Sequence, residues 1–248
     1  MSTANAMKKI GLIGGLSYPS TITYYELVNR LGNRYLGAAR SPRIVMESLN
    51  FQTIADGLRT GDCRAVQEEL CTAASRLADA GAELIAMCCN TVHKFANEVE
   101  ASTDVPIVNI CRCTAGYASL AGFRHVGLMG SAYSMEESFY RGEFARHGVL
   151  VSIPSPAGRR FIQHAIETEL SIGKISDATR ARFIRIAQEL IDQGSQALVL
   201  ACTEIPLVLR PGDVDVPVID TVRVHVDSIL QAAAETHFSM ETSCERII

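Results

Sequence analysis

Two cysteines in this 248-residue sequence follow short apolar segments and precede polar residues. Cys89 ends "GAELIAMCC" and precedes Asn90 and Thr91, and Cys202 ends "ALVLAC" and precedes Thr203. An ordinary thiol has a pKa near about 8.5, so thiol and thiolate are both accessible near neutral pH, as general acid–base catalysis requires. If both side chains face one substrate, a thiolate can remove a proton from one face of a carbon while a thiol returns one to the other face. This is the chemistry of a racemase.

The chain repeats itself, and the repeat pairs these two cysteines. The recurring segments are "KIGLIGG" (9–15) with "HVGLMGS" (125–131), "GAELIAMCCNT" (81–91) with "GSQALVLACTE" (194–204), and "DVPIVNI" (104–110) with "DVPVIDT" (215–221). Their common order and nearly constant spacing indicate an internal duplication. The alignment sets Cys89 opposite Cys202 and Cys88 opposite Ala201, so we expect Cys88 to be a buried packing residue.

Short apolar runs that alternate with helical patterns predict an α/β fold with parallel sheets. Runs continuous in Val, Ile and Leu are typical of strands buried on both faces. The expected strands are 9–14, 43–48, 83–88, 106–110, 125–130, 150–154, 197–202 and 216–220. The clearest helical patterns are 20–33, 62–80, 134–147, 176–193 and 221–235. Because ligands bind at the carboxyl ends of parallel strands, we expect an active site in a cleft between two lobes.

Polar residues follow the two cysteines where helices are expected to begin. Asn and Thr are favoured at helix N-termini, whose free N–H groups bind carboxylates and favour the thiolate form of a nearby cysteine. A small molecule with a carboxylate is therefore the expected partner. Pyridoxal phosphate, the usual electron sink for amino-acid racemisation, is held by a Schiff-base lysine. None of the four lysines lies in a recognisable cofactor context, so no cofactor is expected.

Three segments, "GLIGGLSYPSTITYY", "CNTVHK" and "CTEIPL", resemble signature segments of the aspartate/glutamate racemase superfamily, most closely its aspartate racemase branch. The resemblance runs from about residue 8 to residue 235. It implies a cofactor-independent, two-base amino-acid racemase with two pseudosymmetric flavodoxin-like lobes, commonly a homodimer. Cys89 and Cys202 fall on the family's catalytic pair. The substrate contacts that the resemblance implies are Ser17, Asn90, Thr91, Ser131 and Thr203.

The family arrangement also sets the expected domain boundaries, because in it the C-terminal segment returns to complete the first lobe. The first lobe is expected to span 8–115 and to include 219–236, and the second to span 116–218. Residues 1–7 and 237–248 are expected to be tails.

The expected substrate is an acidic amino acid, aspartate before glutamate. Glutamate racemases have a histidine where Glu204 stands and an aspartate–serine loop in place of "GGLSYPS". That loop also departs from the aspartate branch, with Leu16, Tyr18 and Pro19 replacing Met, Trp and Glu. Glutamate or broad-specificity racemisation and a one-thiol isomerase or decarboxylase therefore stay open. A Cys89–His93 thiol hydrolase and a non-catalytic amino-acid sensor are further alternatives.

Several residues are candidates for supporting roles. Gly15 would allow close backbone approach to a carboxylate, since the glycine spacing does not match the nucleotide-binding G-x-G-x-x-G. His93 could assist Cys89 or be a structural histidine, and Glu204 could orient, cap or transfer a proton. The candidate cations for a second substrate carboxylate are Arg40, Arg43, Arg59, Arg160 and Lys174. The cysteines without a repeat partner, expected to be packing or surface thiols, are Cys63, Cys71, Cys111, Cys113 and Cys244.

Composition excludes several other classes of protein. The formal charge of −4 offers no basic surface for nucleic acid. No apolar run approaches the roughly 18 residues that span a bilayer, and no signal-peptide pattern precedes the first expected strand. The eight cysteines include no C-x-x-C pair, so we expect reduced thiols, no metal site and a cytoplasmic protein.

Overall fold

The structure, a computed structural model, describes residues 7–37 and 40–234. Within them the chain forms two compact units, one ending at Asn109 and resuming at His225, the other spanning Ile110–Val224. The family arrangement predicts these divisions after residue 115 and before residue 219. The first division precedes Ile110 and Cys111 because both side chains pack in the core of the second unit. The expected tails, apart from Met7, and residues 235–236 lie outside the described residues.

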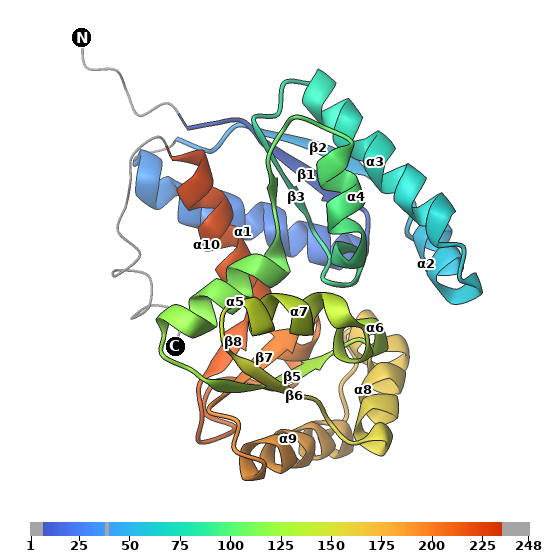
Figure 1. Ribbon diagram of the computed structural model, residues 1–248, viewed down its shortest axis with the longest axis vertical. Coiled ribbons are helices and arrows are strands. Elements are labelled where there is room, and N and C mark those ends of the chain that lie inside the picture. The colour runs from blue at the N-terminus through green and yellow to red at the C-terminus, as the bar shows by residue number, and fades with distance from the viewer. Residues whose placement is uncertain (1–6, 38–39, 235–248) are drawn as a thin grey trace. The chain divides into compact units, whose positions relative to one another are not determined.

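A four-stranded parallel sheet in the order β2-β1-β3-β4 forms the centre of the first unit (Figure 1). Its strands are β1 (Ile10–Gly14), β2 (Ile44–Ser48), β3 (Leu84–Met87) and β4 (Ile107–Val108). The central strand β1 pairs with β2 on one side and with β3 on the other, with Ile13 opposite both Glu47 and Met87. Every residue of β1 and β3 is buried, which confirms that these continuous apolar runs are two-sided core strands.

Helices cover the first sheet. They are α1 (Tyr18–Leu36), α2 (Phe51–Thr60), α3 (Cys63–Asp79), the 3₁₀ helix η1 (Thr91–Phe95), α4 (Ala96–Ala101) and α10 (Thr221–Ala233), which enters this unit at His225. One core cluster joins Ile13, Ile85 and Met87 of the sheet to α2, α3 and α4. Helices α1 and α10 lie against each other (Figure 1), and a side chain added at Gly32 of α1 would meet Pro42 and Leu230 of α10.

The second unit repeats this sheet with the strand order β6-β5-β7-β8. Its strands are β5 (His125–Gly130), β6 (Leu150–Ser152), β7 (Ala197–Ala201) and β8 (Val218–Asp220). Strands β1 and β5, β3 and β7, and β4 and β8 thus hold the same places in the two sheets. These are the three pairs of segments that recur in the sequence, so the predicted duplication is confirmed at the level of topology.

Helices lie on both faces of the second sheet. They are α5 (Ile110–Leu120), α6 (Ala132–Glu136), α7 (Ser138–Arg146), α8 (Pro156–Thr168), η2 (Leu170–Ile172), α9 (Asp177–Asp192) and η3 (Ile205–Leu207). Val126, Leu128 and Val199 pack with α5 and α7, whereas the alternate residues Met129 and Leu198 pack with α8 and α9. The unit is therefore a three-layer α/β structure.

Two expected elements differ from the structure. The strand expected at 106–110 is only Ile107–Val108, since Ile110 already begins α5. The helix expected at 134–147 is two helices, because Glu137 is extended, with φ −79° and ψ 165°, and separates α6 from α7. The other expected strands and helices lie within a few residues of their predicted positions.

Candidate active site

Cys88 and Cys89 follow β3 directly but have different surroundings. Cys88 is fully buried, whereas Cys89 is partly exposed. The Cys88 backbone is fixed, because its N–H donates to the Ile13 carbonyl at 2.9 Å and its carbonyl accepts from the Ser20 hydroxyl at 2.6 Å. Burial, with a smaller contribution from Cys89, raises the pKa of the Cys88 thiol far above its usual range. Cys88 therefore stays a neutral packing residue, as predicted, and Cys89 presents the accessible thiol.

The loop after β1 lies beside the Cys89 loop, because β1 and β3 are neighbours and Ile13 is opposite Met87. Gly15 has a φ of +70°, and a side chain there would collide with the Leu49 backbone, so only glycine fits. Its N–H donates to the Thr21 hydroxyl at 2.9 Å. Ser17 follows with φ 112° and ψ 112°, a conformation that L side chains rarely adopt. Strain at one residue costs of order 1–3 kcal/mol and tends to occur at functional sites.

Glycine at position 17 should separate strain from function. Ser17→Gly is expected to raise the free energy of unfolding by about 1 kcal/mol, because glycine adopts this backbone without strain. If Ser17 contacts the substrate carboxylate, as the resemblance implies, the same change is expected to lower kcat/KM by roughly 10-fold, because a hydrogen bond to a charged group is lost. Urea unfolding and steady-state kinetics check the two effects. Unchanged kcat/KM would remove Ser17 from the substrate contacts.

The residues expected to cap helices adopt a different local structure. Asn90 has helical dihedrals, φ −66° and ψ −47°, and its side chain makes no capping hydrogen bond to the short helix η1. Glu204 precedes η3, also without a side-chain cap. The prediction that Asn90 and Thr91 cap a regular helix is therefore wrong, because the chain turns at once into a 3₁₀ helix. Thr91 is the first residue of that helix, so the start of η1 still lies two residues after Cys89.

The second cysteine is hydrogen-bonded to a carboxylate. Cys202 follows β7 and is partly exposed, and its thiol donates to Glu204 Oε2 at 3.0 Å. The Thr203 hydroxyl donates to the same oxygen at 2.6 Å. Glu204 thus collects two donors within its own loop, an arrangement that holds the carboxylate next to the sulfur.

Ser131 lies beside the Cys202 loop for the same reason that the loop after β1 lies beside the Cys89 loop. Strands β5 and β7 are neighbours with Gly130 opposite Ala201, and Ser131 and Cys202 are the next residues on each strand. Ser131 caps α6, its hydroxyl accepting from the Ser134 N–H at 3.3 Å. Each unit therefore gathers its own predicted residues: one cysteine, a neighbouring serine and a threonine at the carboxyl edge of a sheet.

His93 contacts the backbone of Cys89, not its thiol. Its Nδ1 lies 2.8 Å from the Cys89 carbonyl oxygen, to which only a protonated Nδ1 can donate. The side chain is buried, and burial lowers the pKa of His93 to about 4. The imidazole is therefore neutral near pH 7. This geometry favours a structural role over direct proton transfer.

The candidate cations are all exposed. Arg40 and Arg43 precede β2 and so lie at the amino ends of the strands, at the opposite edge of the first sheet from Cys89. Arg59 lies in the last turn of α2, where it forms an ion pair with Asp56 at 3.0 Å. Lys174 lies in the loop between η2 and α9, and Arg160 in α8. The described contacts join none of the five to a cysteine loop.

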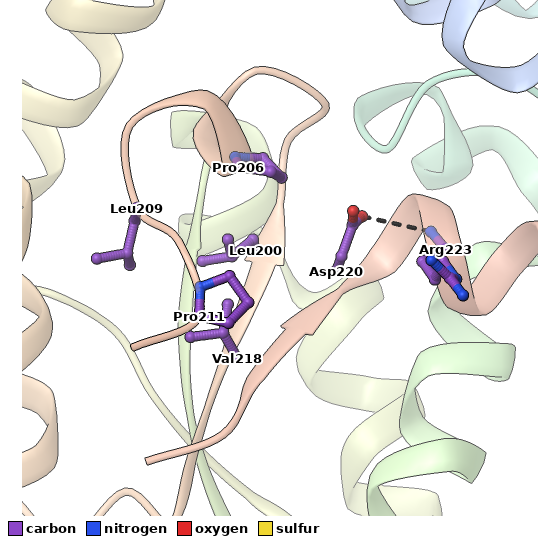
Figure 2. A pocket seen from close by; sticks show the side chains of 7 residues that line it. All are labelled: Leu200, Pro206, Leu209, Pro211, Val218, Asp220 and Arg223. Carbon is purple, nitrogen blue, oxygen red and sulfur yellow. Dashed lines mark hydrogen bonds between the residues drawn. The ribbon is translucent and has the colours of Figure 1, made fainter. Parts of the chain in front are cut away.

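Arg223, a cation that sequence analysis missed, lies near the carboxyl ends of the strands in the second sheet. A pocket of about 160 Å³ lies between the ends of β7 and β8 and the loop after Cys202. Figure 2 shows the side chains that line it. The residues that line it are Leu200, Pro206, Leu209, Pro211, Val218, Asp220 and Arg223. Asp220, whose pKa burial raises, accepts from the backbone N–H groups of Val222 and Arg223. The repeat was the available signal, since "DVPVIDTVR" ends at Arg223 as "DVPIVNICR" ends at Arg112.

The remaining described cysteines are free thiols. Cys63 is exposed, Cys71 and Cys113 are partly exposed and Cys111 is buried, whereas Cys244 lies outside the described residues. Within residues 7–37 and 40–234, no three His, Cys, Asp or Glu side chains gather as a metal ion would require. None of the described helices is both long enough and apolar enough to cross a membrane.

Comparison with known proteins gives consistent matches over most of the chain. The family model for Asp/Glu/Hydantoin racemases matches residues 13–229. A solved structure of a proposed Asp/Glu racemase from Yersinia pestis is 37% identical, with a TM-score of 0.87 and coverage of 92% of this chain and 99% of the other. An aspartate racemase homologue from Pyrococcus horikoshii OT3 is 29% identical, with a TM-score of 0.81 and coverage of 92% and 99%. A broad specificity amino-acid racemase of Bacillus subtilis is 22% identical over 215 residues, 86% of this chain and 92% of the relative.

Proposed function

Since the chain belongs to the Asp/Glu/hydantoin racemase family and is an isomerase of the racemase type, we propose that Cys89 and Cys202 racemise an acidic amino acid without pyridoxal phosphate. Aspartate is the first substrate to test, because the signature segments are closest to the aspartate racemase branch. The relative from Bacillus subtilis, named for broad specificity, keeps a wider range of amino acids as the alternative.

One observation carries the proposal. Both units place a partly exposed cysteine within two residues of the end of the corresponding strand, β3 in one sheet and β7 in the other. Ser131 directly follows β5, the neighbour of the Cys202 strand, and Ser17 lies in the loop that follows β1, the neighbour of the Cys89 strand. A two-base racemisation requires one acid–base group at each face of the same carbon. A single-thiol hydrolase gives no reason for the second cysteine.

The proposed reaction moves one proton off Cα and places another on its opposite face. The substrate meets one cysteine as thiolate and the other as thiol. The thiolate takes the Cα proton, so that a C–H bond breaks, an S–H bond forms, and the electron pair stays on Cα, delocalised into the carboxylate. The thiol then gives its proton to the other face, a new C–H bond forms and its sulfur becomes the thiolate. Hydroxyl and backbone N–H donors of the loops would stabilise the charge on the carboxylate.

Glu204 makes the two bases unequal in this scheme. Its carboxylate accepts from the Cys202 thiol at 3.0 Å, which favours the protonated form because a thiolate there would face a second negative charge. Cys202 is therefore the proton donor in the resting protein and Cys89 the base. In this assignment the first proton removed is the one that faces Cys89.

Neutralising Glu204 should change how well Cys202 is held and protonated. Glu204→Gln is expected to lower kcat/KM by roughly 10- to 100-fold, within the range of one acid–base contribution. The loss must be equal for both enantiomers, because the equilibrium constant of a racemisation is one. Steady-state kinetics in both directions measures it. The matched control is Glu143→Gln, which removes a mostly buried carboxylate of α7 that pairs with Arg146. An equal loss in the control would remove Glu204 from the mechanism.

The experiment that tests the proposal is racemisation without pyridoxal phosphate. The purified protein is incubated in deuterium oxide with L-aspartate, L-glutamate or a neutral L-amino acid, and optical rotation and deuterium at Cα are followed together. We expect rotation to be lost as deuterium enters, fastest for aspartate. Faster turnover of other amino acids would replace aspartate as the substrate. Absence of both signals with every amino acid would contradict the racemase proposal and favour the hydrolase or the sensor.

The proposal extends to assembly and location. We propose a homodimer on the strength of the family resemblance, which light scattering would test against the chain mass of 26.9 kDa. We also propose a cytoplasmic protein, where the free thiols of the described residues would stay reduced.

A further inference from the structure

Two histidines far apart in the sequence meet next to the Cys89 loop. His93 belongs to η1 and His225 to α10, and their ring centroids lie 5.6 Å apart with an interplanar angle of 78°. Tyr24 of α1 packs on the other histidine in the same edge-to-face manner, its ring 5.6 Å from that of His225. All three side chains are buried. Such a polar cluster is costly in a core unless its hydrogen bonds are satisfied.

The hydrogen bonds of the cluster define which nitrogen of each ring carries the proton. His225 Nε2 lies 2.7 Å from the Val108 carbonyl, so Nε2 is the protonated donor and Nδ1 accepts from the Tyr24 hydroxyl at 2.8 Å. His93 has the opposite arrangement, with Nδ1–H donating to the Cys89 carbonyl at 2.8 Å. The His93 backbone N–H also donates to the next carbonyl, that of Asn90, at 3.2 Å. One residue thus holds two successive peptide groups at the catalytic loop.

Both imidazoles are held in the neutral form that these bonds require. Burial lowers the pKa of His93 to about 4. Burial, and then the neighbouring His93, lower the pKa of His225 to about 3. A protonated His225 would lose the Nδ1 lone pair that accepts from Tyr24, so the hydrogen bonds and the neutral state depend on each other.

We propose that His93, backed by His225 and Tyr24, is a positioning residue that fixes the direction of the Cys89 thiol through the Cys89 carbonyl. This inference rests on the proposed function of Cys89. A peptide group held at its oxygen cannot rotate freely, so the Cα–Cβ bond of Cys89 and the following N–H groups keep one orientation. Proton transfer depends steeply on such orientation, and a displacement of about 1 Å can cost roughly 100-fold in rate.

The cluster also connects the loop to the rest of the first unit. Tyr24 brings in α1, Val108 brings in β4 and His225 brings in α10, the segment that the chain contributes last. Through His225, His93 is therefore supported by three elements and not by the loop alone. This is the support that a precisely placed base needs.

Two substitutions of His93 distinguish a positioning role from core filling, because the two roles predict opposite orders of kcat for the two variants. Asparagine is smaller but places an amide N–H near the position of Nδ1, whereas leucine fills the volume and has no donor. If His93 positions Cys89, His93→Leu lowers kcat by roughly 10- to 100-fold with little change in KM. His93→Asn then keeps kcat within a few-fold of the original protein. If His93 only fills the core, leucine keeps kcat and asparagine loses it.

The support from His225 has its own pair of variants. His225→Gln keeps a donor near Nε2 for Val108, whereas His225→Phe keeps only the ring, so kcat should fall more in the second. Thr114→Val in the second unit is the matched control. Thr114 is equally buried, and its hydroxyl donates to the Ile110 carbonyl at 2.7 Å. Its kcat should be unchanged. A kcat that follows only the unfolding midpoint across all five variants would overturn the positioning role.

Hydrogen–deuterium exchange of the peptide covering residues 88–95 gives a readout that needs no activity. Exchange should be faster in His93→Leu than in His93→Asn and the original protein. If no amino acid is racemised but this ranking holds, the proposed function fails and the structural support of the Cys89 loop stands. If racemisation is seen but leucine and asparagine rank the other way in both kcat and exchange, the proposed function stands and the positioning role is overturned.

Discussion

Replacing either Cys89 or Cys202 with serine is expected to lower the racemisation rate by at least about 1,000-fold, toward the upper end of what one acid–base group contributes. The change in size is small, but a hydroxyl is a far weaker acid than a thiol and supplies almost no base near neutral pH. Because each turnover uses both sulfurs, loss of either one should be nearly as damaging as loss of both. The measurement is kcat/KM for both enantiomers of the best substrate.

Each serine variant should still remove the proton that faces its remaining thiol. Cys89→Ser and Cys202→Ser are therefore expected to exchange the Cα proton with solvent in opposite enantiomers, without inversion. Cys88→Ala is the control, because Cys88 is adjacent to Cys89 but fully buried, and its kcat should be unchanged. Full racemisation in either serine variant would exclude the two-base mechanism. Exchange of the same enantiomer in both variants would also contradict it.

Acidification is expected to destabilise the fold through His93 and His225. Their folded pKa values of about 4 and about 3 lie below the ordinary histidine value, so the unfolded chain binds protons that the folded chain excludes. The stabilisation is complete above the unfolded pKa of about 6.5 and is lost as the pH falls toward the folded values. Between pH 7 and pH 5 the two histidines together should lower the free energy of unfolding by about 4 kcal/mol.

Urea unfolding across this pH range measures the effect, and a double variant isolates the share of the two histidines. His93→Asn with His225→Gln keeps much of the hydrogen bonding but cannot bind the protons. Its stability is expected to be lower at pH 7 and much less dependent on pH above pH 5, where most carboxyl groups stay ionised. The same slope in the double variant and the original protein would show that these histidines are not buried in the neutral form.

Local sequence patterns predicted the strands and the duplication well, because parallel strands buried on both faces are continuous apolar runs. The repeat also identified which of Cys88 and Cys89 is accessible. The prediction that Asn90 caps a helix was wrong, because residue preference alone does not distinguish a regular helix from the 3₁₀ helix that forms here. Glu137 similarly interrupts a helical pattern by one extended residue.

Long-range packing was beyond the reach of those patterns. Tyr24 and His225 are 201 residues apart in the sequence, and nothing local to either indicates that they share a hydrogen bond. His93 was identified as a candidate from its distance to Cys89, but only the fold shows that it holds a carbonyl and not a thiol. The boundary at Asn109 likewise depends on the packing of Ile110 and Cys111, which an apolar pattern assigns to either unit equally well.

The most direct test of the two-base mechanism is the position of deuterium early in the reaction, with the original protein turning over its best L-amino acid in deuterium oxide. The thiol that donates to the second face carries a solvent deuteron, whereas the proton removed stays on the other sulfur. At low conversion we therefore expect deuterium at Cα in nearly every D-product molecule and protium in nearly all of the remaining L-substrate. Transfer of the substrate's own proton into the product, with deuterium appearing equally in recovered substrate, would show one base serving both faces and would contradict the roles given to Cys89 and Cys202.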